Sequence, residues 1–312
     1  MITKRPVHRR RILLLILLLG LVLKLNGDLA KATDQVNVSQ RSHTLTGNIR
    51  LHRNFHSRFL SRDRDLIVYL PPGYERENIT HYPVLYMQDG QNLFDAATSF
   101  FPGMERHMDE SAQTLIEQKI IHPLIIVGIY STGLDRLNEY TPTMLPNGRG
   151  GEADAYGRML VEEIKPFIDN QYRTLRNPSE TGLGGSSLGG LLTIYLGLKY
   201  AHTFGILEAS SPACDWDSEM IIRYVDSLQR KTRQRIWLTV GTGEPERFLS
   251  STRALREALT AKGWKEGIDL GYLEAPGAEH NPADRARLNS QLLEFLFPPS
   301  GPKPAKVFGP RL

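Results

Sequence analysis

Cysteine is almost absent from this chain of 312 residues, which contains Cys214 alone. A single cysteine excludes an intramolecular disulfide framework and any metal cluster built on several cysteines. The chain also lacks His-Glu-x-x-His and similar ligand spacings, so we expect no required metal, and we expect no cofactor. No activating pair accompanies Cys214, so we expect a small packed residue rather than a nucleophile.

An excess of basic charge is also missing once the first residues are set aside. Residues 1–32 contain seven basic residues and one acidic residue, a net charge of +6. Because the whole chain carries +4, residues 33–312 carry about −2. The basic character therefore belongs to the leader, and the composition gives no support for a nucleic-acid partner.

The leader has the pattern of an export signal. A basic stretch ending at Arg11 precedes an apolar run of twelve residues, Ile12–Leu23. A membrane-spanning helix needs about 20 residues, whereas a signal-peptide core is shorter. Ala30 and Ala32 provide small residues at the spacing that a signal peptidase reads. We predict a signal peptide over 1–32, a linker over 33–42, and a periplasmic or secreted protein; the alternative is an uncleaved leader that anchors the protein to the membrane.

The rest of the chain alternates between short apolar runs and helical patterns. We expect eight strands: Thr44–Leu51, Leu66–Leu70, Pro83–Met87, Leu124–Tyr130, Gly182–Ser186, Gly205–Ala209, Ile236–Val240 and Leu270–Leu273. Helical periodicity separates them from the third run onward, which predicts an α/β fold with a mostly parallel sheet covered by helices on both faces. No helix separates the first two runs, so we expect an antiparallel edge hairpin there. A single domain over 43–297 and a flexible tail rich in proline and glycine over 298–312 complete the organisation.

Ligands of open parallel sheets bind at the carboxyl ends of the strands, and a glycine-rich segment follows the fifth strand. It runs Gly182-Leu183-Gly184-Gly185-Ser186-Ser187-Leu188-Gly189-Gly190. A phosphate-binding P-loop is excluded because the segment has no lysine at its end. A dinucleotide fingerprint remains an alternative, with Gly182, Gly184 and the later acid Glu208, but its third glycine position is Ser187.

The same segment matches Gly-x-Ser-x-Gly completely, with Ser187 between a strand and an apolar helix. A serine raised from such a sharp turn has strained backbone geometry, and side chains at Gly185 and Gly189 would collide with the neighbouring strand and helix. Glycines that simply let a helix approach the sheet are the structural alternative. The Leu188 amide at the helix start would point toward the oxygen that becomes negative on attack.

A serine nucleophile needs a base, and in this architecture the order along the chain is serine, acid, histidine. Only two of the nine histidines follow Ser187. His202 ends the helix that Ser187 begins, roughly 20 Å away at about 1.5 Å per residue, so it cannot reach back. His280 follows the last strand and precedes Asn281 and Pro282, a helix cap and first-turn pair. We predict His280 as the base.

The acid that orients the histidine is expected after the seventh strand. That loop contains Glu244 and Glu246, and we favour Glu244 because it is nearer to the strand end. Asp215 and Asp217, after the sixth strand, are the alternative source. The loop after the third strand contains Asp89-Gly90-Gln91, and the amide of Gln91 is the expected second oxyanion donor.

The motifs together resemble the putative-esterase family of α/β hydrolases. The similar segments are Val68–Tyr74, Pro83–Phe94, Arg136 with Glu139–Pro142, Gly184–Gly190, Ser210–Ala213 and Glu279–Asn281. Similar proteins include siderophore esterases of the enterobactin type, feruloyl and acetyl-xylan esterases, S-formylglutathione hydrolases and mycolyltransferases. The chain departs from the family at 103–107, where members often have a tryptophan, and at 213–216, where they often carry bulky aromatics.

The resemblance implies an α/β-hydrolase fold, Ser187, His280 and Glu244 as the catalytic residues, and the amides of Gln91 and Leu188 as the oxyanion hole. The segment 131–158 is long and weakly periodic, so we expect a substrate-facing loop. Arg136 and Tyr140 on it, and Trp216, are candidate substrate contacts, although Arg136 and Tyr140 could equally fix the loop to the domain.

The sequence thus predicts an exported serine esterase without a cofactor. Its partner would be a small-molecule or carbohydrate-linked ester of the siderophore, sugar or aromatic type. An acyltransferase that uses an alcohol acceptor, and a hydrolase-fold binding protein without catalysis, are the alternatives.

Overall fold

The apolar runs of the sequence form one eight-stranded sheet. A computed structural model describes residues 42–299. The strands are β1 (Asn48–Phe55), β2 (Arg64–Leu70), β3 (Val84–Gln88), β4 (Ile125–Ile129), β5 (Thr181–Ser186), β6 (Ile206–Ser210), β7 (Arg235–Gly241) and β8 (Leu270–Ala275). Their order across the sheet is β1-β2-β4-β3-β5-β6-β7-β8. The predicted sheet is confirmed.

The antiparallel part of the sheet lies at its β1 edge. Asn48 pairs with Leu70 and Leu51 pairs with Ile67, so β1 and β2 form the expected antiparallel pair. β2 is also antiparallel to β4, whereas β3, β5, β6, β7 and β8 pair in parallel. The carboxyl ends of these parallel strands therefore meet at one edge of the sheet, where the loops after them can share a site.

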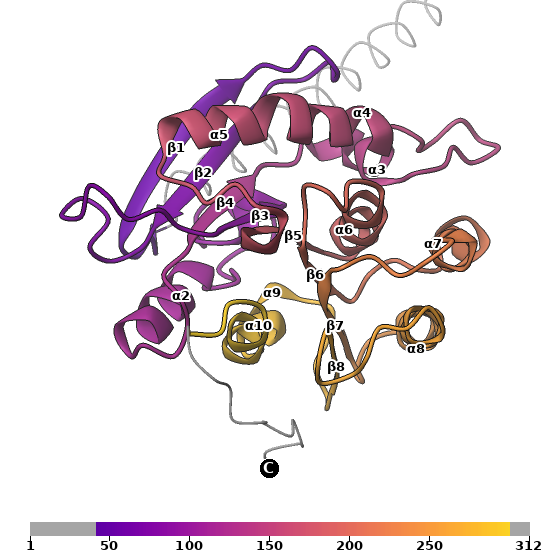
Figure 1. Cartoon of the computed structure of the whole chain (residues 1–312). Helices are drawn as coiled ribbons and strands as arrows, with labels where there is room; N and C mark the ends of the chain where they lie inside the picture. Colours follow the sequence, from indigo (N-terminus) through magenta and orange to yellow (C-terminus); the bar gives the residue numbers. More distant parts are fainter. Residues whose placement is uncertain (1–41, 300–312) are drawn as a thin grey trace, which may run out of the picture. The chain divides into compact units, whose positions relative to one another are not determined.

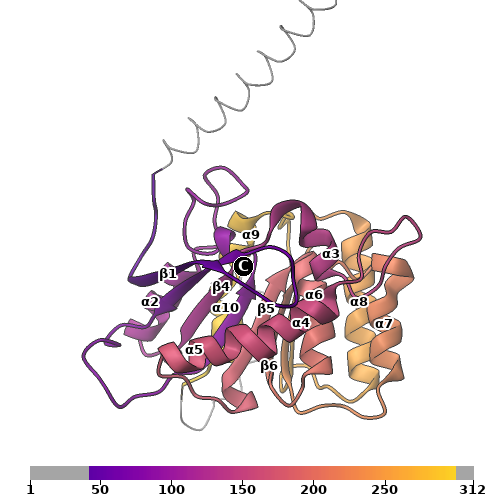
Figure 2. The same cartoon turned by 90° about the horizontal axis from the view of Figure 1, so that it is seen from above.

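Helices cover both faces of the sheet, as predicted (Figure 1). They are α2 (Met108–Glu117), α3 (Arg136–Tyr140), α4 (Ala153–Met159), α5 (Lys165–Gln171), α6 (Leu188–Lys199), α7 (Trp216–Ser227), α8 (Glu246–Ala261), α9 (Pro282–Ala286) and α10 (Asn289–Leu296). α2 and α10 pack on one face, and α4 to α8 pack on the other. The two short helices α3 and α9 both lie along one edge of the sheet (Figure 2).

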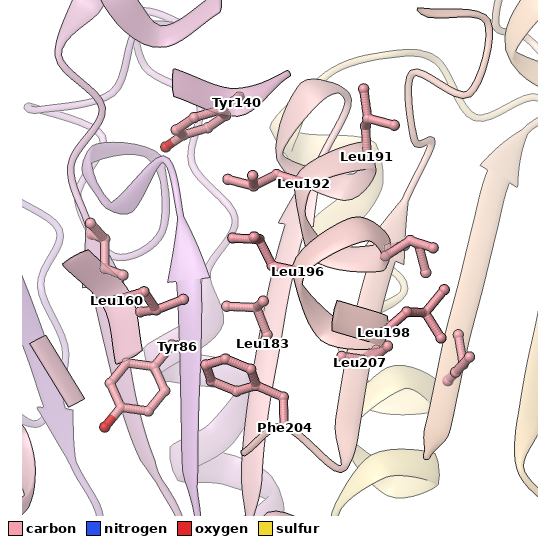
Figure 3. Close-up of a cluster of buried hydrophobic side chains, with 14 of the residues drawn as sticks. Tyr86, Tyr140, Leu160, Leu183, Leu191, Leu192, Leu196, Leu198, Phe204 and Leu207 are labelled. Atoms are coloured by element: carbon pink, nitrogen blue, oxygen red, sulfur yellow. The ribbon is translucent and has the colours of Figure 1, made fainter. Parts of the chain in front are cut away.

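Alternating strand residues divide the core into two apolar clusters. Val68 and Tyr86 belong to the cluster under α4 to α8, whereas Tyr69 and Leu85 belong to the cluster under α2 and α10. This division follows from the two-residue period of a strand. α6 is apolar on nearly every side, and its Leu192 and Leu196 face Leu183 of β5 (Figure 3). Burial of α6 fixes the position of the segment that precedes it, which contains Ser187.

Three local expectations differ from the structure. The first strand begins four residues later than expected. The helical pattern from Tyr156 to Ile168 predicts a kink at Pro166, but Pro166 lies in the first turn of α5, and the irregularity comes before it, as a π-helical turn over Leu160–Ile164. Proline has no amide hydrogen to donate, so it is tolerated in a first turn. The segment 131–158 is not an extended loop, because it contains α3 and most of α4.

The predicted signal peptide and residues 33–41 of the predicted linker lie outside the described residues, as does the tail from residue 300 onward. Within residues 42–299, no helix combines the length and the apolarity that a membrane crossing requires.

Candidate active site

Ser187 occupies a strained turn between β5 and α6. Its backbone has φ 60° and ψ −123°, a left-handed conformation that a residue with a side chain rarely adopts. The turn is held by main-chain hydrogen bonds, because Ser187 N donates to Ser210 O at 3.0 Å and Ser187 O accepts from Ala213 N at 3.0 Å. Ser187 is therefore fixed at the carboxyl edge of the sheet, where α6 begins.

The glycine at position 185 is required by the close approach of this turn to its neighbours. A Cβ there would lie 2.6 Å from Gln88 Oε1 and 2.7 Å from the carbonyl carbon of Gly189. Added at Gly189, a Cβ would meet Gln88 Cβ at 3.3 Å, which is tight but less severe. The collision expected from the sequence is thus found, and it is strongest on the strand side.

His280 and Glu244 meet at the ends of β8 and β7. His280 Nδ1 lies 2.5 Å from Glu244 Oε2, and the imidazole packs on the ring of Phe248 with the centroids 4.5 Å apart. The imidazole is 28% exposed, whereas the Glu244 side chain is 2% exposed. The contact engages Nδ1, which leaves the second ring nitrogen of His280 for a proton transfer.

The carboxylate of Glu244 is held by three donors. Besides His280, Ser211 Oγ donates to Oε1, and Gly241 N donates to Oε1 at 3.1 Å. Burial alone would raise the pKa of Glu244, but the hydrogen bonds from His280 and Ser211 outweigh burial, and the pKa is lowered. Glu244 is therefore an ionised carboxylate at neutral pH, and it can stabilise a positive charge on the imidazole.

The other acidic candidates do not contact His280. Glu246 is exposed in the first turn of α8. Asp215 pairs with Arg247 at 3.4 Å, and Asp217 lies in the first turn of α7. Of the carboxylates considered from the sequence, Glu244 is the one that the structure brings to His280.

Ser187 and His280 line the same cavity, although 92 residues separate them in the chain. The cavity encloses about 320 Å³. Its lining comprises Gln88, Asp89, Asn92, Leu93, Phe100, Phe101, Arg106, Arg136, Ser186, Ser187, His280, Pro282 and Arg285. A substrate in this cavity would contact the hydroxyl of Ser187 and the imidazole of His280 together.

The two predicted oxyanion donors lie beside the cavity. Leu188 is the first residue of α6, where helix amides have no acceptor within the helix. Gln91 lies in the short turn η1 (Gly90–Asn92), and residues on both sides of it, Asp89 and Asn92, line the cavity. Its side chain bonds to Ser131, with Gln91 Nε2 3.0 Å from Ser131 Oγ. The predicted role concerns the main-chain amide of Gln91, not this side chain.

The three candidate substrate contacts differ in their surroundings. Arg136 lines the cavity and makes two hydrogen bonds of 2.6 Å to the carboxylate of Asp89. Tyr140 is fully buried beneath Arg136, and its hydroxyl accepts from Asp89 N at 3.3 Å. Trp216 is half-buried outside the cavity lining and donates to Thr143 Oγ1 at 3.1 Å. Neither Tyr140 nor Trp216 lines the cavity. Their hydrogen bonds, with Asp89 and Thr143, instead fix the 131–158 segment to the domain.

Three polar residues near the site, Ser211, Arg106 and Arg285, were not predicted as site residues from the sequence. Ser211 bonds to Glu244, while Arg106 and Arg285 line the cavity. Glu208 is fully buried and pairs with Arg106, with Arg106 Nη2 3.4 Å from Glu208 Oε1. An acid so buried is not available to a ribose hydroxyl, which removes the main support for the dinucleotide alternative.

Two further groups bear on metal and thiol chemistry. Cys214 is fully buried, and burial raises the pKa of its thiol well above the ordinary value, as expected for a packed residue. In the described part of the chain, donor atoms of Glu105, His107 and Glu110 lie within 4.8 Å of one another. His107 Nδ1 is 3.2 Å from Glu110 Oε1, and Glu105 accepts a hydrogen bond from Thr44. None of these three residues lines the cavity that contains Ser187 and His280.

Comparisons with known proteins find a matching family, related sequences and similar solved structures. The sequence matches the family described as "Putative esterase" over residues 57–287. "Ferri-bacillibactin esterase BesA" of Bacillus subtilis (strain 168) is 28% identical over 245 residues, which cover 71% of this chain and 81% of BesA. YbbA of the same organism is 25% identical over 248 residues, which cover 75% of this chain and 93% of YbbA. Among solved structures, the BES protein from Bacillus cereus has a TM-score of 0.64 and 22% identity over 83% of this chain and 98% of its own. The fold is thus the α/β-hydrolase fold of the esterases.

Proposed function

We propose that this chain, which belongs to the Putative esterase family, is a serine carboxylic-ester hydrolase. Its membership in that family and its similarity to the esterase BesA support ester hydrolysis as its activity. Ser187 is the nucleophile, His280 the base and Glu244 the acid that orients it. The observation that carries this proposal is the shared cavity of Ser187 and His280, with Glu244 bound to the far side of the imidazole. No cofactor takes part in the reaction.

The reaction follows from the roles of these groups. Ser187 Oγ attacks the ester carbonyl carbon while His280 takes the hydroxyl proton. The negative charge on the carbonyl oxygen is stabilised by the amides of Gln91 and Leu188. The tetrahedral intermediate then expels the alcohol, which receives the proton from His280. Water attacks the acyl-enzyme with His280 again as base, and the carboxylic acid and free Ser187 are regenerated.

Hydrolysis of a para-nitrophenyl ester tests the proposed roles. Ser187→Ala and His280→Ala should each lower turnover by about 10⁴–10⁶-fold, because nucleophile and base act as one unit. His202→Ala is the matched control, since His202 is the other histidine after Ser187 and is exposed in the turn that follows α6. Equal turnover by Ser187→Ala and the parent protein would contradict the mechanism.

The natural ester is proposed to be of the siderophore, sugar or aromatic type. The relative BesA is named a ferri-bacillibactin esterase, which favours the siderophore type among these. Comparing kcat/KM over a panel with one ester of each type, with a sugar acceptor added in parallel, tests this proposal. A higher rate of acyl transfer to the sugar than to water would favour the acyltransferase alternative.

We also propose that the protein is exported through a signal peptide over 1–32. The support is the basic start, the apolar run Ile12–Leu23 and the Ala30-Lys31-Ala32 site. Expression of the full chain and N-terminal sequencing of the exported product should give Thr33 as the first residue. A product in the membrane fraction that retains Met1 would show an uncleaved anchor instead.

A further inference from the structure

The cavity beside Ser187 is lined by more cations than anions. Three arginines, Arg106, Arg136 and Arg285, face it with one carboxylate, Asp89. Arg136 and Asp89 neutralise each other through two hydrogen bonds of 2.6 Å. The charges of Arg136 and Asp89 are therefore balanced within the cavity wall. The partners of the other two arginines, Arg106 and Arg285, have to be considered separately.

Arg106 is only loosely satisfied. Its Nη2 lies 3.4 Å from Glu208 Oε1, its Nη1 donates to Ser186 Oγ at 3.3 Å, and its Nε has no hydrogen-bond partner. Glu208 Oε1 also accepts from Ser210 Oγ. Glu208 thus balances the charge of Arg106 but leaves hydrogen-bonding capacity on this guanidinium.

Arg285 has no balancing partner of its own. The residue is 7% exposed, and its Nε and Nη2 have no hydrogen-bond partner. No carboxylate of residues 42–299 lies within ion-pair distance of it. Burial, and then the positive charge of Arg106, lower the pKa of Arg285 to about 10, so it remains protonated at neutral pH. A buried cation with unused donors is costly, because its lost hydration is not replaced.

Glu244 does not fill this role. Glu244, Glu208 and Asp89 all attract Arg285 through space, but none of them forms an ion pair with it. The two carboxylate oxygens of Glu244 accept from His280, Ser211 and Gly241. The hydrogen-bond donors of Arg285 therefore remain unused by the acid that orients His280. Arg285 nevertheless lines the cavity that Ser187 and His280 also line, so an anion bound there would lie beside its guanidinium.

Hydrogen bonds hold the main chain that carries Arg285 and Arg106. The side chain of Asn281 accepts from Asp284 N at 2.9 Å and caps α9, which carries Arg285. Asp284 in turn accepts from Glu279 N at 2.8 Å, which ties α9 to the loop that carries His280. The Arg106 carbonyl accepts from Asn289 Nδ2 at 2.6 Å. The backbone positions of both arginines are thereby fixed relative to His280.

We infer that Arg285, together with Arg106, forms an anion subsite, and that the natural ester carries a carboxylate or similar oxyanion close to the bond that is cleaved. Guanidinium groups present several donors in a fixed plane and suit such oxyanions. Phe100 and Phe101 line the same cavity and would contact the apolar body of an organic acid. This inference rests on the proposed function, because Ser187 is taken as the attacking group.

Matched esters that differ in one charge test the subsite without any change to the protein. Para-acetoxybenzoate and its methyl ester place the charge in the alcohol part, while para-nitrophenyl hemiadipate and its methyl ester place it in the acyl part. The charged member of at least one pair should have the higher kcat/KM, by about 10–100-fold, the worth of a charge-assisted hydrogen bond in a buried site. Equal rates, or faster reaction of the neutral member, in both pairs would overturn the inference.

Variants of Arg285 identify the source of the preference. Arg285→Gln should lower the ratio of kcat/KM for the charged ester to kcat/KM for the neutral ester to about one, and Arg285→Lys should restore part of that ratio. Arg287→Gln is the control, because Arg287 lies two residues away with a side chain 78% exposed. An equal loss on charged and neutral esters would show a role in folding alone and would overturn the subsite.

Binding separates failure of the subsite from failure of the proposed function. Calorimetry with Ser187→Ala protein should detect adipate or inorganic phosphate, and Arg285→Gln added to that variant should weaken the Kd by about tenfold or more. If hydrolysis depends on Ser187 but neither anion binds, the subsite alone is wrong. If Ser187→Ala still hydrolyses esters, the proposed function is wrong, whatever the anions do.

Discussion

Replacement of Glu244 by glutamine examines the interaction between the acid and the imidazole. The substitution retains the size of the side chain and removes its negative charge. His280 Nδ1 lies 2.5 Å from Glu244 Oε2, and the carboxylate is 2% exposed, so solvent does not screen the interaction. The imidazole gains a positive charge each time it takes the proton of Ser187, and the carboxylate stabilises that charge.

The magnitude follows from this burial. Removing one partner of a buried charge pair costs about 3–5 kcal/mol. At about 1.4 kcal/mol for each factor of ten, Glu244→Gln should lower kcat/KM by about 10²–10⁴-fold. The amide of glutamine can also donate to Nδ1, which would leave the proton on the other ring nitrogen and prevent His280 from acting as base.

The assay is kcat/KM for a para-nitrophenyl ester, with thermal unfolding to check that the variant is folded. Glu246→Gln is the control, because Glu246 is two residues away, exposed and not in contact with His280. The reasoning would be refuted if a folded Glu244→Gln protein kept more than about a tenth of the activity, or if Glu246→Gln lost as much.

Three further predictions concern residues around the site and the edge of the sheet. Ser211→Ala removes a donor to Glu244 Oε1 and should lower kcat by about 3–30-fold, which steady-state kinetics would detect; an unchanged kcat would mean that Gly241 N alone suffices. Gly185→Ala places a Cβ 2.7 Å from main chain and should lower the free energy of unfolding by more than about 2 kcal/mol in urea, with little loss contradicting the close approach. Burial, and then the hydrogen bond with Glu110, raise the pKa of Asp109 to about 9, so the contribution of this group to stability is greatest below its ordinary value of 3.8 and falls as pH rises toward 9. Asp109→Asn cannot ionise and should gain about 1–3 kcal/mol at pH 8 relative to the parent, but not near pH 4; equal unfolding curves at both pH values would contradict this.

The sequence was sufficient for the sheet because buried strands differ clearly from their surroundings. β3 to β7 are buried along almost their whole length, and their predicted limits differ by at most one residue from those found. β1 is different, since it lies at the edge of the sheet with half of its residues exposed. Its apolar pattern is therefore weak, and a strand predicted from it can be displaced along the chain.

The motif residues of the site could be predicted because each is marked by its neighbours in the chain. Glycines flank Ser187, and the Asn281-Pro282 pair after His280 does cap a helix, as the sequence indicated. Arg106, Glu208 and Arg285 have no such local mark. They come together through three separate segments of the sheet edge, and a single sequence does not reveal which distant charges will be buried side by side.

Reaction with a fluorophosphonate tests the central claim most directly, because it reports the activated serine itself. Mass spectrometry of the treated protein should show one adduct, on Ser187, that is absent from Ser187→Ala and forms far more slowly in His280→Ala. An adduct on a different residue, or none on protein that is folded, would contradict the assignment of Ser187 and His280 as nucleophile and base.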